Sequence, residues 1–399
     1  MSRVELLAPA GSLEKLKIAY LYGADAVYLG GVNYSLRANA TNFSDEEIKI
    51  GCDYAHRLGK KIYVTVNIVF HNDDYEGLVS YLKRLASFGV DAIISSDPSI
   101  IDIVHKEGIS LDIHLSTQMS MANYEAVLFW KRMGVSRVVM AREASRGDIK
   151  EIIDKTGMEV ECFLHGAMCS AYSGRCVLSN YFTNRDANRG ACAQICRWCF
   201  SLESDSDKID NDVKFTMSTK DLSMIKNLAD MIDIGISSLK IEGRMRSNYY
   251  IATVISTYRE AIDNYYNGTL SDGLISYYSN ILNRVANRES IEQFYNRDSS
   301  VCDQYFLGRQ EVSNQDFLGI VLDYDNDSKM VTLTQRNYFK PGDKVEFFGP
   351  SIKTFSYVIP KIYDVDGNEV PCANHPKEII KFKLDHEVDK SDMMRVKVF

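Results

Sequence analysis

The chain has 399 residues, 45% of them hydrophobic, and a formal net charge of −8. That length allows one large domain and a smaller one, and the composition is that of a globular protein. No run of eighteen apolar residues suggests a membrane span, and the first residues lack a signal peptide's apolar stretch, so we expect a cytoplasmic protein. The negative charge means that any nucleic-acid binding would need a local basic face.

The first 270 residues alternate short apolar runs with amphipathic helical patterns. Strands are predicted at 4–8, 26–29, 62–66, 92–95, 112–115, 137–140, 159–164 and 237–241. Eight strand–helix units in succession predict a (β/α)8 TIM-like barrel, with a doubly wound open sheet as the alternative.

In such a barrel the active site lies at the C-terminal ends of the strands. This rule selects polar residues that follow the predicted strands: Asn67, Ser116, Gln118, Arg142, Glu143, His165, Glu242 and Arg244. Arg142 and Arg244 could clamp a small dicarboxylate by bidentate pairing, or could instead form ion pairs with Glu143 or Glu242. His165 and Glu242 are the candidate catalytic groups for proton transfer.

The regular spacing breaks once, between the seventh and eighth strands. The gap is roughly 70 residues, against about 2–6 for an ordinary βα loop. A helix predicted at 220–231 leaves 166–218 as an insertion above the barrel mouth. This insertion carries five cysteines in the spacing C-x6-C-x15-C-x3-C-x2-C, which are Cys169, Cys176, Cys192, Cys196 and Cys199.

Clustered thiols in a long chain favour metal ligation over disulfides. Iron–sulfur clusters take four thiolates from varied loop spacings. Structural zinc usually pairs C-x2-C motifs, which only Cys196 and Cys199 fit, and buried apolar cysteines are a third interpretation. One of the five is in excess, and the aromatic neighbours of Cys199 predict that it packs in the protein.

The insertion is also locally basic and aromatic. Between Cys169 and Cys199 it carries four arginines, one acid and four large aromatic residues: Arg175, Arg185, Arg189, Arg197, Asp186, Tyr172, Tyr181, Phe182 and Trp198. Such a mixture suits an unpaired RNA base, for which Tyr172 and Arg175 are candidate binding residues. Alternatively, the arginines compensate the negative charge of a thiolate-bound cluster.

The rest of the chain divides in two. Residues 271–314 are predicted to form a helical connector, and residues 315–399 a small all-β barrel domain, because apolar and polar residues alternate there. The segments 325–328 and 340–343 are turn-like. The predicted domains are therefore 1–270, which includes the insertion 166–218, then 271–314 and 315–399.

The segment ECFLHGAMCSAYSGRCVLS, residues 161–179, resembles the signature of the collagenase-like "peptidase U" family, number 32 among the unassigned peptidases. The signature runs Glu-x-Phe-x-x-Gly, a small residue, an aliphatic residue and Cys, and closes with Gly-x-Cys-x, an aliphatic residue and Ser. The matching residues are Glu161, Phe163, Gly166, Ala167, Met168, Cys169, Gly174, Cys176, Leu178 and Ser179.

Within that family the sequence is most similar to the tRNA hydroxylation proteins. The resemblance implies formation of 5-hydroxyuridine at the wobble position of tRNA, with prephenate as the hydroxyl source and a possible partner subunit of the same family. Relatives that hydroxylate the ubiquinone ring hold a 4Fe–4S cluster through four cysteines. Carried over by motif, the ligands here are Cys169, Cys176, Cys192 and Cys196.

Two other functions remain open. A peptidase would act through a bound metal or through Cys169 with His165, the one local thiol–imidazole pair, although no Gly-x-Ser-x-Gly or His-Glu-x-x-His motif is present. A non-catalytic scaffold that carries a cluster and binds RNA fits the same motifs.

Overall fold

A computed structural model describes residues 3–36, 42–201, 214–286, 288–305 and 316–398. Eight parallel strands pair in sequence, and the last of them pairs with both the seventh and the first, so the sheet closes. The barrel strands are β1 (Glu5–Pro9), β2 (Ala26–Gly30), β3 (Lys61–Val66), β4 (Ala92–Ser95), β5 (Asp112–Leu115), β6 (Arg137–Val139), β7 (Glu159–Gly166) and β11 (Ser238–Ile241). This confirms the (β/α)8 barrel and rules out the open sheet.

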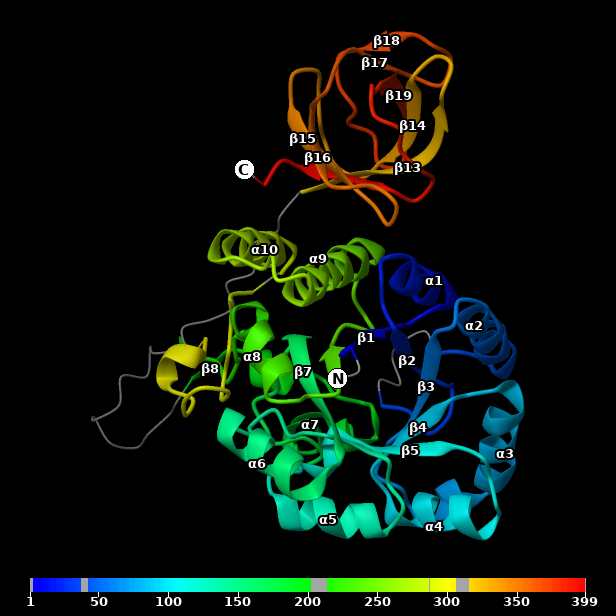
Figure 1. Ribbon diagram of the computed structural model, residues 1–399, viewed down its shortest axis with the longest axis vertical. Helices are drawn as coiled ribbons and strands as arrows, with labels where there is room; N and C mark the ends of the chain where they lie inside the picture. The colour runs from blue at the N-terminus through cyan, green and yellow to red at the C-terminus, as the bar shows by residue number, and fades with distance from the viewer. Residues whose placement is uncertain (1–2, 37–41, 202–213, 287, 306–315, 399) are drawn as a thin grey trace.

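Helices surround the barrel (Figure 1). They are α1 (Leu13–Leu21), α2 (Asp45–Arg57), α3 (Leu78–Phe88), α4 (Pro98–Lys106), α5 (Tyr124–Arg132), α6 (Arg146–Thr156), α8 (Leu228–Asp233) and α9 (Asn248–Tyr266). Local chemistry sets their ends: Ser44 and Glu47 form a reciprocal capping box at the start of α2, and Gly89 ends α3 with φ 86°. Within the described ranges, none of the helices is long and apolar enough to cross a bilayer.

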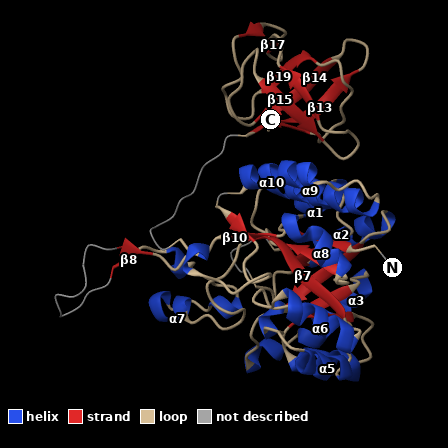
Figure 2. Ribbon diagram, turned by 60° about the vertical axis from the view of Figure 1, so that its left-hand side comes forward, coloured by secondary structure: helices blue, strands red, loops and turns tan. Residues whose placement is uncertain are grey.

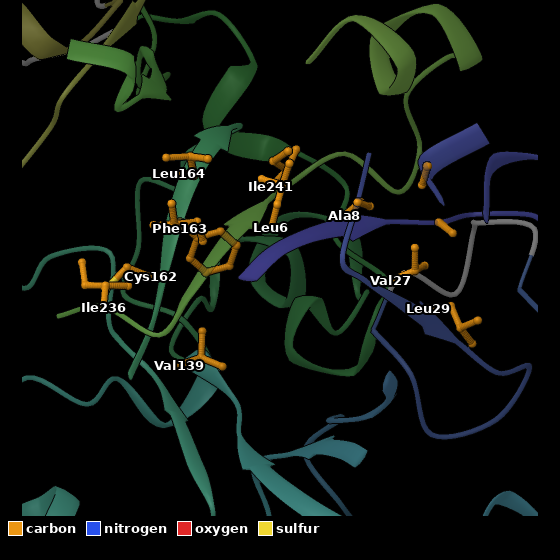
Figure 3. Packing of buried hydrophobic residues seen from close by; sticks show 14 of the residues in the cluster. Leu6, Ala8, Val27, Leu29, Val139, Cys162, Phe163, Leu164, Ile236 and Ile241 are labelled. Carbon is orange, nitrogen blue, oxygen red and sulfur yellow. The ribbon is translucent and has the colours of Figure 1, made fainter. Parts of the chain in front are cut away.

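The main core lies between the strands and the helices. Alternate side chains of each strand point outward, so Leu6 and Ala8 of β1 and Val27 and Leu29 of β2 join one buried apolar cluster (Figure 3). Burial of this kind contributes about 25 cal/mol for each Å² of apolar surface removed from water.

The interior of the barrel is partly ionic. Arg137 on β6 contacts Glu5 at 2.6 Å and Glu161 at 3.4 Å, and Lys240 on β11 contacts Glu161 at 2.7 Å. The four side chains lie inside the barrel and carry two positive and two negative charges, so the network is balanced.

The predicted helix at 220–231 is wrong over its first residues. Asp221–Ser223 form strand β10, and Leu222 pairs with Gly166 at the end of β7 in antiparallel register. A 3-10 turn, Ile225–Asn227, follows, and α8 begins only at Leu228. The long β7 offers an unpaired backbone edge beyond the barrel rim, and pairing with β10 satisfies it.

The cysteine-rich insertion lies to one side of the barrel, where Figure 2 labels α7 and β8. It contains α7 (Leu178–Thr183), the 3-10 turns Ala187–Arg189 and Ile195–Arg197, and a two-stranded pair of β8 (Phe200–Ser201) with β9 (Lys214–Phe215). Residues 202–213 of the predicted insertion are outside the described residues.

After the barrel come α10 (Asp272–Val285), β12 (Ser290–Ile291), which pairs with β10, and the 3-10 turn Val301–Asp303. Residues 306–314 of the predicted connector lie outside the described part of the chain. The C-terminal domain is an antiparallel eight-stranded sheet in the order β16-β15-β20-β13-β14-β19-β17-β18, curved into a half-barrel. Its strands are β13 (Phe317–Asp325), β14 (Met330–Gln335), β15 (Lys344–Phe348), β16 (Phe355–Val358), β17 (Ile362–Tyr363), β18 (Glu369–Val370), β19 (Ile379–Lys383) and β20 (Met393–Val396).

Helices α9 and α10 lie between the two domains (Figure 1). The ring of Tyr249 on α9 stacks on Phe317 of β13 with centroids 4.5 Å apart, and Arg284 on α10 pairs with Asp316 at 2.6 Å. These contacts attach the β domain to the outer helices of the barrel.

Candidate active site at the barrel mouth

A cavity of about 220 Å³ lies at the C-terminal ends of the barrel strands, beneath the cysteine-rich insertion. Six of the eight residues selected at strand ends line it: Asn67, Ser116, Gln118, Arg142, Glu242 and Arg244. Glu143 and His165 do not. The insertion supplies the other wall, from Ala167 to Arg197.

Four of the five clustered cysteines line this cavity, and they are Cys169, Cys176, Cys192 and Cys196. All four are free thiols. Burial raises the pKa of the Cys169 thiol, and the neighbouring Cys196 and Cys176 raise it further, although its side chain is accessible from the cavity. Across the described ranges, no three cysteine, histidine or acidic side chains are gathered closely enough to hold a metal ion as they stand.

Cys199 differs from these four. It is not part of the cavity lining, and it is exposed instead of packed as its aromatic neighbours predicted. Its neighbour Trp198 is itself exposed, whereas Phe200 is half-buried against Phe182 and Phe215.

The two signature glycines are required where the insertion touches the barrel. Gly166 has φ 118°, and a Cβ there would lie 2.6 Å from the carbonyl oxygen of Glu242. Gly174 has φ 75°, and a Cβ there would lie 2.6 Å from the carbonyl oxygen of Gln118. Both positions combine a left-handed backbone with a close approach that excludes any side chain. At these two glycines the cysteine-bearing loop packs directly against the ends of β5 and β11.

Besides Arg244, two cationic side chains of the barrel, Arg142 and Lys240, line the cavity. The Arg142 guanidinium lies over the Phe163 ring, 3.8 Å from its centroid, and makes one long hydrogen bond, 3.4 Å, to the Ser173 hydroxyl. The buried Lys240 ammonium contacts Glu161 and lies 4.4 Å from the centroid of the Tyr28 ring. The search for polar residues after strand ends did not select Lys240, because it lies within β11.

Arg244 has a different role from the expected clamp. It is buried, and its guanidinium donates to Ser35 Oγ at 3.1 Å, to the carbonyl oxygen of Leu36 at 3.1 Å and to Asn42 Oδ1 at 2.8 Å. These bonds hold the segment after β2 against the end of β11. Arg244 thus shapes the cavity wall.

Glu242 is an acidic residue of the cavity lining. The Tyr28 hydroxyl lies 3.1 Å from Glu242 Oε2 and 3.0 Å from the carbonyl oxygen of Ile241. Tyr28 therefore orients this carboxylate while its ring covers Lys240. The arrangement can hold or move a proton at Glu242 Oε2.

The structure does not bring His165 to the cavity. The β7–β11 register shifts between Lys240 and Ile241, and beyond the shift His165 faces helix α9. There its Nδ1 lies 3.3 Å from the Tyr258 hydroxyl, and burial lowers its pKa to about 3. A neutral, buried imidazole packed between two tyrosines is a core residue and not the expected proton-transfer group.

The four arginines of the insertion separate into two pairs. Arg189 forms an ion pair with Asp74, and Arg197 lines the cavity and donates to Gln194 Oε1 at 3.0 Å. Arg175 and Arg185 are exposed, and their guanidinium groups have no hydrogen-bond or ion-pair partner among the residues the structure describes.

The chain is similar in sequence to curated proteins that it matches over different shares of their length. The tRNA hydroxylation protein P1 of Bacillus subtilis is 49% identical over 98% of this chain and 94% of its own. The 23S rRNA 5-hydroxycytidine C2501 synthase of Escherichia coli is 38% identical over 65% of this chain and 39% of its own. A collagenase of Porphyromonas gingivalis is 35% identical over 73% of each chain.

Two family models cover nearly the whole sequence. Peptidase family U32 matches residues 11–305, and the peptidase family U32 C-terminal domain matches residues 313–395. The first match includes the barrel, the cysteine-rich insertion and the cavity, and the second includes the half-barrel. The chain therefore belongs to peptidase family U32.

Proposed function

We propose that this protein is an RNA hydroxylase that forms 5-hydroxyuridine at the wobble position of tRNA, with a 4Fe–4S cluster bound at the barrel mouth. The observation that carries the proposal is that four free thiols and the cations Arg142 and Lys240 share one cavity. A relative 49% identical over nearly the full length is named for tRNA hydroxylation, and another for hydroxycytidine in rRNA.

The chemistry of the donor set fits an iron–sulfur cluster, and the four thiols would have to move closer together to bind it. Cys169, Cys176, Cys192 and Cys196 would hold it, since thiolates are the usual ligands of such clusters and all four line the same cavity. When bound, the cluster would supply one-electron chemistry beside the substrate. Arg142 and Arg197 in the same lining would offset part of its negative charge. Zinc is the alternative metal at these thiols, and metal analysis of the purified protein would distinguish it from iron.

The barrel residues would hold the small co-substrate, a prephenate-like dicarboxylate. Arg142 presents a planar guanidinium fixed over Phe163, and Lys240 presents an ammonium at the floor. Together they suit two carboxylate groups better than the Arg142–Arg244 pair expected from sequence, because Arg244 bonds to the segment after β2. Glu242, oriented by Tyr28, would hold or move a proton beside the bound substrate.

The peptidase alternative has the collagenase relative in its favour. Against it, Cys169 lines the cavity while His165 faces Tyr258 on α9, so these two do not form a thiol–imidazole pair. Purified protein, both reduced and metal-loaded, is expected to leave gelatin and casein intact. Cleavage that thiol reagents inhibit would support the peptidase instead.

The test of the proposed function is nucleoside mass spectrometry of tRNA from a strain lacking the gene. We expect the 5-hydroxyuridine-derived nucleosides to fall and to return with the wild-type gene but not with a Cys192→Ser variant. An unchanged nucleoside profile would refute the proposal. Binding of tRNA by purified protein without turnover in the presence of prephenate would instead indicate a non-catalytic scaffold.

A further inference from the structure

Two large aromatic side chains stand exposed beside the cavity. Tyr172 is itself part of the lining, and 56% of its surface is open to solvent. Trp198 is 47% exposed and directly follows Arg197, which also belongs to the lining. A soluble protein seldom leaves such large rings in water without a use.

Helix α7 extends this aromatic surface outward. Leu178 and Ser179 line the cavity, whereas Tyr181 and Phe182 lie on the solvent side, 84% and 47% exposed. Their ring centroids are 5.2 Å apart in an edge-to-face arrangement. The helix that forms part of the cavity wall therefore presents aromatic side chains on its solvent side. We call Tyr172, Trp198, Tyr181 and Phe182 the aromatic rim.

The charge around the aromatic rim is positive in a chain that is negative overall. The segment from Cys169 to Cys199 has four arginines and one acid, against a net charge of −8 for the whole protein. Arg189 and Arg197 are engaged in the fold, but Arg175 and Arg185 are exposed, and their guanidinium groups have no partner in the described part of the chain. Such unpaired cations beside exposed rings are complementary to a phosphate backbone with unstacked bases.

We infer that the aromatic rim, with Arg175 and Arg185, binds an unpaired stretch of RNA whose central base enters the cavity. Flanking bases stack on Tyr172 and Trp198, and the arginines contact phosphates. The inference rests on the proposed function, because the base that enters the cavity is the one to be modified. It goes further in assigning the protein surface that recognises the strand and in requiring that the strand be unpaired there, since a base within a duplex could not leave its stack without cost.

The distribution of tryptophan provides a direct test. The chain has two, Trp198 on the aromatic rim and Trp130, which is only 5% exposed in the barrel wall. Titration of anaerobically purified full-length protein with a synthetic anticodon stem-loop should quench the Trp198 fluorescence and reduce its accessibility to iodide. In a Trp198→Phe variant the remaining Trp130 signal should not respond. A fully paired RNA duplex of equal length should quench weakly.

Variants separate this surface from non-specific attraction. An Arg175→Ala/Arg185→Ala variant should bind the stem-loop about tenfold more weakly. Two lost phosphate contacts should also reduce the slope of log K against log salt by about 1.4. Arg132→Ala is the matched control, since Arg132 is exposed at the C-terminal end of α5, on the opposite face of the barrel from the strand ends. Its affinity and salt slope should equal those of the wild type.

Two outcomes would overturn the inference. RNA binding that leaves Trp198 accessible would place the strand elsewhere. Protection of Trp198 on concentrating the protein without RNA would show that the aromatic rim is an interface between copies of the chain. Neither result would refute the proposed function, which is tested separately by nucleoside analysis of tRNA. If the modification depends on the gene but Trp198 stays accessible, only the inferred binding surface is wrong.

Discussion

Asp74 and Arg189 form a two-pronged ion pair, with distances of 2.6 and 2.9 Å, between positions 115 residues apart. Asp74 belongs to a 3-10 turn after β3, and Arg189 to one within the cysteine-rich insertion. Arg189 also donates to the carbonyl oxygen of Val69 at 2.5 Å. Both side chains are partly exposed, and the pair joins the insertion to the barrel.

Asp74→Asn should loosen this attachment. Hydrogen bonds from Arg189 hold the pKa of Asp74 at about 2, below the ordinary value near 3.9. The carboxylate therefore stabilises the fold above pH 4, and that contribution is lost as the pH falls through 2. We expect Asp74→Asn to cost on the order of 1 kcal/mol in urea unfolding at neutral pH and to flatten the acid dependence. Asp102→Asn, which breaks an exposed pair with Lys106, is the control and should change little.

Gly174→Ala tests the close contact between the signature segment, residues 161–179, and the end of β5. The new methyl group would meet the Gln118 carbonyl oxygen at 2.6 Å in a backbone with φ 75°. Gly108 also has a positive φ, 59°, but a Cβ there has nothing within 4 Å, so Gly108→Ala measures backbone strain alone, about 1 kcal/mol. Gly174→Ala should destabilise more than that control and lower the iron content. Equal effects in urea unfolding would show that the close approach is unimportant.

Much of the architecture follows from sequence periodicity. Parallel barrel strands are buried on both sides, so their apolar runs stand out, and most predicted strands agree with the structure to within a residue or two. The C-terminal-end rule then places six polar residues correctly in one cavity, since every parallel strand ends at the same face. The four cysteines that lie close together in the sequence also line one cavity.

The failures come from features that periodicity does not encode. His165 lies past a register shift, so the alternation that points Phe163 to the cavity no longer applies to it. Asp221–Ser223 pair with the extension of β7, and that tertiary pairing overrides a local helical pattern. Lys240 has its charge balanced by Glu161 on another strand, a partnership that only the closed barrel creates.

Replacement of single cysteines should separate the four cavity thiols from the fifth. Cys199 is exposed and outside the lining, so Cys199→Ser should retain iron and sulfide at the wild-type ratio after anaerobic purification. Cys192→Ser should lose most of both, together with the visible charge-transfer absorption, because one of four thiolates is missing. Iron loss in Cys199→Ser with retention in Cys196→Ser would exchange the roles of these two residues.

Lys240 and Glu161 are both almost fully buried and lie 2.7 Å apart, so each charge depends on the other for its compensation. Lys240→Met keeps the volume but leaves Glu161 with only the longer contact to Arg137, 3.4 Å, so we expect a loss of about 3 kcal/mol in the free energy of unfolding. In the double variant Lys240→Met/Glu161→Gln the uncompensated charge is gone, and part of that stability should return. Additive losses in urea unfolding would mean that the two side chains are not coupled. If Lys240 also holds a carboxylate of the co-substrate, the double variant should remain folded yet need a higher prephenate concentration, a result that stability alone would not produce.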